Sequence, residues 1–101
     1  MKLTDALPEL VADLESALAR LGRPDLVRQL SQLAIERWRY DEFSDTTYLA
    51  LAAADASEAE RLSLYDELGV NVDMDRAGRV VGLEILEGSH VASLLAAAPG
   101  S

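Results

Sequence analysis

The 101-residue sequence contains no cysteine and only one histidine, His90. The lack of cysteine excludes disulfide bonds, thiolate zinc sites, iron–sulfur clusters and cysteine nucleophiles, and it is typical of a reducing compartment. The sequence also has no glycine-rich phosphate-binding loop. Its longest largely apolar run, Val91 to Ala98, is far shorter than the ~20 residues that a membrane-spanning helix needs. We therefore expect no cofactor and no membrane span, and Asp5 near the start favours a cytoplasmic location over secretion.

Aromatic residues are also scarce, at 5% of the chain, although 50% of the residues are hydrophobic. A core built mainly from leucine, valine and alanine is enough for one domain of this length. Because small side chains fill space poorly on their own, we expect a second copy of the chain to complete part of the apolar surface. The predicted state is a homo-oligomer, most simply a dimer.

Basic residues are few, and their distribution divides the chain. Residues 1–40 carry six basic and six acidic side chains, whereas residues 41–101 carry three basic and twelve acidic ones. The whole formal net charge of −9 therefore belongs to the second part. Such a surface repels nucleic acid and attracts a basic protein. The charge thus indicates a basic protein partner and no nucleic acid, although it also serves solubility.

The first part of the chain has the spacing of two helices. Its apolar residues recur at alternating steps of three and four, which predicts a first helix that begins with Asp5 as N-cap and ends before Gly22. Pro24 suits the first position of a second helix. The predicted helical hairpin occupies residues 1–35 as an extension in front of the sheet.

The pattern changes near Trp38. Glu36, Trp38 and Tyr40 alternate with their neighbours, and the aromatic residues favour a strand from about Glu36 whose partner is Tyr48 to Ala52. The alternative is that the second helix continues through Trp38, which lies four residues after Ala34. We favour the strand because it has a natural partner.

Further alternation predicts an antiparallel sheet over residues 36–88. Glu60–Tyr65 and Val70–Met74 are predicted strands, and a tight turn with a left-handed Gly78 leads to a returning strand around Val81–Ile85. Leu51 to Ala56, of low complexity, is a predicted loop.

The chain ends in a predicted helix over residues 89–98, with Ser89 as its cap and Pro99-Gly100 as its stop. The predicted fold class is α+β in a single domain. It consists of an N-terminal helical hairpin, a four- to five-stranded antiparallel sheet and a short C-terminal helix.

Two stretches resemble a known family when they are taken together. Tyr40 to Leu51 contains Tyr-Asp, a turn, an Asp and a strand with a Tyr, and Val70 to Leu86 contains an Asp-rich strand, a Gly turn and the closing Gly82-Leu83-Glu84-Ile85. Over about residues 38–90 the chain is similar to the small bacterial and archaeal domain of unknown function 2283. The N-terminal hairpin, and Glu42-Phe43 where a proline is common, depart from the family pattern.

The resemblance implies a compact antiparallel sheet and no established activity. Members of the family are often encoded beside small toxin-like proteins, which implies an antitoxin-like role. The N-terminal hairpin is then this chain's own addition, for oligomerisation or for binding a partner.

The residues themselves give little support for catalysis. His90 and Ser89 are adjacent, and residues that start a helix seldom point at each other, so a cap and an exposed histidine explain them best. Asn71, Asp73 and Asp75 have the alternate spacing of a calcium loop, but Gly falls at the eighth position instead of the sixth. We therefore expect no metal site and no enzymatic activity.

Two hypotheses of function remain. The favoured one is a non-catalytic protein-binding module, antitoxin-like, that docks a basic protein through its acidic sheet. The alternative is a structural scaffold that self-assembles through its N-terminal helices. The candidate partner-binding residues are Asp41, Asp45, Asp73, Asp75 and Trp38. The candidate oligomer interface consists of Leu7, Leu10, Leu14, Leu18 and Leu30.

Overall fold

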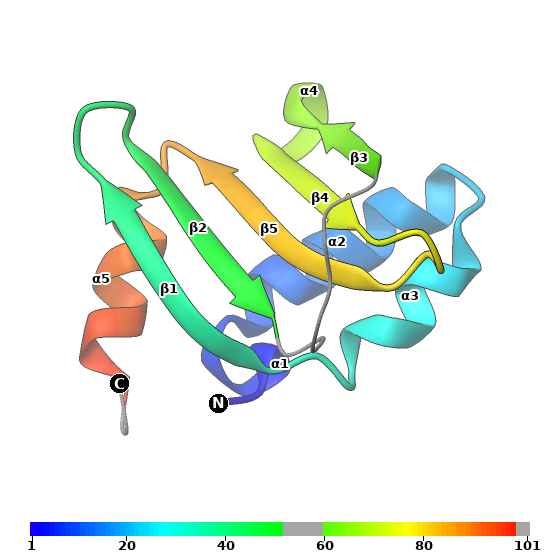
Figure 1. Ribbon diagram of the computed structural model, residues 1–101, viewed down its shortest axis with the longest axis horizontal. Coiled ribbons are helices and arrows are strands. Elements are labelled where there is room, and N and C mark those ends of the chain that lie inside the picture. Colours follow the sequence, from blue (N-terminus) through cyan, green and yellow to red (C-terminus); the bar gives the residue numbers. More distant parts are fainter. Residues whose placement is uncertain (52–59, 99–101) are drawn as a thin grey trace.

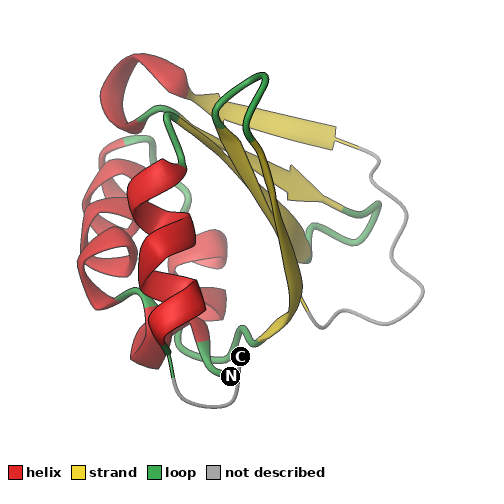
Figure 2. Cartoon of the chain, turned by 90° about the vertical axis from the view of Figure 1, so that its left-hand side faces the viewer, coloured by secondary structure: helices red, strands yellow, loops and turns green. Residues whose placement is uncertain are grey.

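The computed structural model describes residues 1–51 and 60–98. This part of the chain forms two layers, a five-stranded antiparallel sheet and a group of helices that covers one of its faces (Figures 1 and 2). The predicted α+β class, with N-terminal helices, an antiparallel sheet and a C-terminal helix, is confirmed. Most of the predicted loop from Leu51 to Ala56, and the predicted stop at Pro99-Gly100, lie outside the described residues.

Three helices precede the sheet, namely α1 (Leu3–Ala6), α2 (Pro8–Arg20) and α3 (Pro24–Leu30). The prediction of one continuous helix capped by Asp5 is wrong, because the chain leaves the helical conformation at Leu7, with φ of −136° and ψ of 62°. Pro8 causes this break. Its ring disfavours a helical conformation of the preceding residue and suits the first position of the next helix.

The end of α2 agrees with the sequence-based prediction. Gly22 has a φ of 71°, its N–H donates to the Ala19 carbonyl at 3.1 Å, and the Arg23 N–H donates to the Leu18 carbonyl at 3.0 Å. This arrangement is a Schellman motif, which satisfies carbonyls at the end of the helix. It also reverses the chain, so that α3 packs beside α2.

The leucines of these helices belong to the core of one chain. Leu7, Leu14, Leu18 and Leu30 are all buried within it, and only Leu10 is partly exposed. The sheet presents a wide apolar face, and covering that face uses the leucine stripe that the sequence suggested for an oligomer interface. Of the five predicted interface residues, Leu10 alone therefore keeps appreciable surface for another molecule.

The sheet has the strand order β1-β2-β5-β4-β3, with all neighbours antiparallel. Its strands are β1 (Ile35–Asp41), β2 (Thr46–Leu51), β3 (Glu60–Leu64), β4 (Val70–Met74) and β5 (Val80–Leu86). Trp38 lies in β1, so the favoured strand is confirmed over a continued helix. The last strand, β5, lies between β2 and β4 and joins the two pairs of strands into one sheet (Figure 1).

Two short segments differ from the sequence-based prediction. The helix α4 (Tyr65–Leu68) connects β3 to β4 and ends at Gly69, whose φ is 66°. It was missed because one helical turn has no periodicity to detect. The helix α5 (Ser89–Ala97) follows β5, and its N-cap is Gly88 instead of Ser89. In the described part of the chain, none of the helices is long and apolar enough to cross a membrane.

Alternation along the strands gives the sheet two unlike faces. Leu49, Val72 and Leu83 lie side by side on the face toward the helices, and all three are buried. Their sequence neighbours point the other way, onto a face that no described helix covers (Figure 2). We call this second face the open face.

Replacement of Leu14 by alanine tests whether the N-terminal helices are part of the core. Leu14 is fully buried, so Leu14→Ala should lower the free energy of unfolding by about 3 kcal/mol. Leu21 is 48% exposed at the end of the same helix, and Leu21→Ala should cost less than about 1 kcal/mol. Urea unfolding of both variants measures the difference. Equal losses would contradict the assignment of the helices to a common core with the sheet.

Candidate functional site

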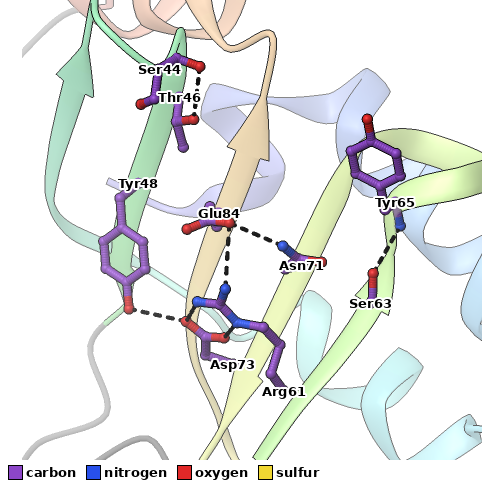
Figure 3. A network of polar contacts seen from close by, with 9 residues as sticks. All are labelled: Ser44, Thr46, Tyr48, Arg61, Ser63, Tyr65, Asn71, Asp73 and Glu84. Carbon is purple, nitrogen blue, oxygen red and sulfur yellow. Dashed lines mark hydrogen bonds and ion pairs between the residues drawn. The ribbon is translucent and has the colours of Figure 1, made fainter.

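An ion pair with a buried carboxylate lies on the open face. Asp73 of β4 is 0% exposed, although it is on the face without helices. Arg61, directly opposite on β3, donates from Nε to Oδ1 at 2.7 Å and from Nη2 to Oδ2 at 3.2 Å (Figure 3). A buried carboxylate is costly unless it is paired and hydrogen-bonded, and this two-point contact meets both conditions.

Two further polar side chains extend this contact across the strands. Arg61 Nη1 also lies 3.4 Å from Oε1 of Glu84 on β5, and Asn71 Nδ2 donates to the same Glu84 oxygen at 3.0 Å (Figure 3). Among the described residues, no buried side-chain nitrogen or oxygen lacks a hydrogen-bond partner. A satisfied network of this kind specifies one arrangement of the strands.

Tyr48 reaches the network from β2 by crossing over Gly82. Its hydroxyl lies 3.5 Å from Asp73 Oδ2, and Gly82 of β5 pairs with Ala50 on one side and with Asp73 on the other (Figure 3). A Cβ atom at Gly82 would lie 2.8 Å from Cζ of Tyr48, and closer still to its hydroxyl. Glycine is therefore required because the tyrosine ring occupies the space of a side chain.

Asp75 is also used inside the chain. Its Oδ1 accepts hydrogen bonds from the N–H groups of Ala77 and Arg79, both at 2.9 Å, and its Oδ2 accepts from Arg79 Nε at 2.8 Å. The hydrogen bond from the Arg79 backbone lowers the pKa of Asp75, although desolvation opposes the shift. Asp75 thus fixes the turn between β4 and β5, and it is only 8% exposed.

The structure therefore separates the four predicted partner-binding acids into two pairs. Asp73 and Asp75 are buried and neutralised by arginine, so they have almost no surface for a partner. The alternate spacing that resembles a calcium loop also reflects contacts within the chain. Asn71, Asp73 and Asp75 each have their own intramolecular partner. In residues 1–51 and 60–98, no group of three His, Cys, Asp or Glu residues could hold a metal ion.

The other two acids lie at one end of the sheet. We call this region the acidic tip and define it as Asp41, Glu42, Phe43, Asp45 and Glu87. Asp41 ends β1, the next three residues belong to the β1–β2 turn, and Glu87 belongs to the turn between β5 and α5, at the same end of the sheet (Figure 1). Phe43 is fully exposed, and none of the four carboxylates forms an ion pair with another described residue.

Several hydrogen bonds hold the acidic tip in place. Tyr40 Oη donates to Asp45 Oδ1 at 2.6 Å, the Phe43 N–H donates to Asp41 Oδ1 at 2.9 Å, and the Gly88 N–H donates to the Asp45 carbonyl at 2.8 Å. Gly88 accepts from Thr47 Oγ1 at 2.7 Å, and a Cβ atom there would lie 2.6 Å from the Thr47 backbone nitrogen. The two turns are therefore tied together, and the loop that presents Phe43 is ordered before any partner binds.

The contact with Asp45 also affects Tyr40. The hydrogen bond to Asp45 raises the pKa of Tyr40, and desolvation and the negative charge of Asp45 act in the same direction. The protonated phenol is the form that donates this hydrogen bond, so the folded loop favours it.

The remaining predicted residues lie elsewhere. Trp38 is half-buried on the side of Leu49 and packs against the core, so it does not join the acids. Ser89 and His90 are exposed in the first turn of α5. Neither has a hydrogen bond that would suggest a catalytic arrangement in the described part of the chain. The sequence did not point to the network around Asp73, although a glycine inside a strand indicates close approach by another group.

A family model described as "Protein of unknown function (DUF2283)" matches residues 37–89, just over half of the chain. The matched segment contains the network around Asp73, Gly82 and the whole acidic tip, whereas α1, α2 and α3 precede it. Comparison with curated proteins and with solved structures found no match.

A double-mutant cycle tests the crossing of Tyr48 over Gly82. Gly82→Ala alone should lower the free energy of unfolding by about 1–3 kcal/mol, because the new methyl group displaces the ring. In a Tyr48→Ala background the same change should be neutral or slightly stabilising, because alanine loses less entropy than glycine on folding. Urea unfolding of the four proteins measures the coupling. Additive effects would show that the position of the Tyr48 ring does not depend on the absence of a side chain at Gly82.

The raised pKa of Tyr40 leads to a test at alkaline pH. A group whose pKa is higher in the folded state stabilises the fold below its unfolded pKa, about 10 for tyrosine. This contribution is lost as pH rises through the folded pKa. Unfolding free energy should therefore fall above pH ~10 in the wild type, and fall less in Tyr40→Phe.

Asp45→Asn keeps the hydrogen-bond acceptor of this contact but removes the charge. It should reduce the rise in the pKa of Tyr40, measured by ultraviolet titration of the phenol. An alkaline loss of stability that is the same in wild type and Tyr40→Phe would contradict the role of this hydrogen bond.

Proposed function

The chain belongs to the DUF2283 family of proteins of unknown function, and we propose that it is a non-catalytic module that binds a basic protein through its acidic tip. The observation that carries this proposal is the fully exposed Phe43 at an end of the sheet that also holds four carboxylates without an arginine or lysine partner in the described chain. Burial of an exposed aromatic ring at an interface removes apolar surface from water, so such a ring can act as an anchor.

The distribution of charge supports the same surface. Arg61 and Arg79 neutralise Asp73 and Asp75, so these acids contribute little to the field outside the molecule. The carboxylates of the acidic tip have no arginine or lysine partner among the described residues that would neutralise them. Complementary charge accelerates the encounter with a basic partner and fixes its orientation, while the desolvated aromatic ring supplies affinity.

The order of the loop lowers the cost of binding. The hydrogen bonds from Tyr40, Phe43 and Gly88 fix the turn around Asp45, whose φ is 53°. Binding then has to immobilise mainly the Phe43 side chain, because the backbone is already in one conformation. A small basic protein that is bound in this way fits the antitoxin-like role that the family resemblance suggests.

Site-specific crosslinking at position 43 tests the proposal. A photoreactive phenylalanine analogue at Phe43 should crosslink, in native cells, to a basic protein. The matched analogue at Tyr65, which is 61% exposed on α4, should not crosslink to it. With the purified partner, Phe43→Ser should weaken binding by about tenfold, the loss typical of an anchor residue. Tyr65→Ser is the control.

The acids provide a second readout. Conversion of Asp41, Glu42, Asp45 and Glu87 to their amides should weaken binding and flatten its dependence on salt. The same number of amides at Glu15, Glu36, Glu60 and Asp66, which are exposed elsewhere, gives the matched control for net charge. A partner that binds the Phe43→Ser protein as tightly as wild type would refute the proposed site.

A further inference from the structure

The helix α5 carries almost no charge, although its outer side is exposed. From Ser89 to Ala97 it contains no acidic or basic residue apart from His90, although 27% of the chain is charged. Leu94 is 45% exposed, and Ala96 and Ala97 are exposed as well. Ser89, His90 and Ser93 are its only polar residues, and a helix with this much apolar surface is normally covered by more than one neighbour. In this fold the sheet covers only one side of α5 (Figure 2).

A groove runs beside this exposed apolar surface. A hollow of about 370 Å³ separates the start of α2 from α5, and a second hollow of about 480 Å³ continues it toward the chain termini. Ala6 and Leu94 line both hollows, so the two form one feature, which we call the α2–α5 groove. Its apolar lining also includes Leu10, Val91 and Met1, and Met1 is 41% exposed.

One rim of the groove is acidic. Asp5, Glu9 and Asp13 line it at steps of four residues along α1 and α2, and none of them forms an ion pair with a described residue. The opposite wall, formed by α5, carries only His90 among titratable groups. Lys2 is the single basic residue at the groove, at its far end. The groove therefore combines an apolar floor with a one-sided row of negative charge.

We infer that the α2–α5 groove binds an amphipathic helix of a partner protein, with leucine-like residues on one face and lysine or arginine along one flank. A helix laid in such a groove buries its apolar residues at spacings of three and four, and its basic flank meets the row of acids. The length of α5, nine residues, matches about two and a half turns of a bound helix. The surface lies on the helical layer, away from the open face, and does not depend on the acidic tip.

A second copy of this chain is the less suitable occupant. A two-fold contact would place the same surface on both sides. The acidic rims of the two copies would then lie in one interface, within a chain of net charge −9. A basic helix removes this repulsion, whereas a second copy doubles the number of acids.

Synthetic peptides test the inference on the full chain. The probe is a 14-residue amphipathic helix of leucine and lysine, compared with a glutamate-for-lysine version and with a scrambled sequence of the lysine peptide. The lysine peptide should bind in calorimetry and shift the amide signals of Ala6, Val91 and Leu94 in NMR spectra. The glutamate version should not bind, and the scrambled peptide should bind at least tenfold more weakly, because it lacks an apolar face.

Two matched sets of variants distinguish the groove from general charge attraction. Leu94→Gln should weaken binding about tenfold, whereas Leu21→Gln, at a similarly exposed leucine (48%), should not change it. The triple variant Asp5→Asn, Glu9→Gln, Asp13→Asn should weaken binding more than the equally charged Glu15→Gln, Glu36→Gln, Asp66→Asn. Far-ultraviolet circular dichroism verifies that each variant is folded.

Three outcomes would overturn the inference. One is equal weakening by both triple variants, which would mean that only net charge attracts the peptide. Another is absence of binding by the lysine peptide. The third is sedimentation of the wild-type chain as a dimer that Leu94→Gln converts to a monomer, because a second copy would then cover the groove. The Phe43 variants leave these measurements unchanged, so the groove and the acidic tip succeed or fail separately.

Discussion

The arrangement of the open face depends on the contact between Asp73 and Arg61. A carboxylate without solvent access requires a cation in the correct place, and only the observed register of β3 against β4 places Arg61 opposite it. A shift by one residue would turn Arg61 to the other face and leave the charge unpaired. Glu84 and Tyr48 extend the constraint to β5 and β2, so one ion pair helps to define the order of four strands.

Ion pairs of this kind also determine which carboxylates remain unpaired at the surface. Arg61 neutralises the acids on the middle of the sheet, and Arg79 neutralises Asp75 in the turn between β4 and β5. The acids of the acidic tip and of the groove rim have no such partner among the described residues. Carboxylates without an ion-pair partner therefore lie at the end of the sheet and on the helical layer, while ion pairs link the strands at the centre of the sheet.

The two layers contribute differently to the proposed binding. The sheet and the acidic tip lie within the segment that matches the family, whereas most of the groove is made by α1 and α2, which precede it. The helices still cannot be regarded as a separate attachment, because Leu14 and Leu18 are buried in the same core as Leu49 and Leu83. The chain therefore carries its particular helical surface on a framework that it shares with its family.

Periodicity, proline and glycine act locally, so the sequence predicted the five strands and most of the helices, but it missed α4 and the break between α1 and α2. It also located the left-handed Gly22 and Gly78 for the same reason. Which acids are paired depends on contacts across the sheet, because Arg61 lies opposite Asp73 while Asp41 forms no ion pair with another described residue. The tertiary structure likewise decided that Leu7, Leu14, Leu18 and Leu30 face the core, and that α5 leaves a groove beside α2. Pairing and burial join residues that are far apart along the chain, and no local pattern contains that information.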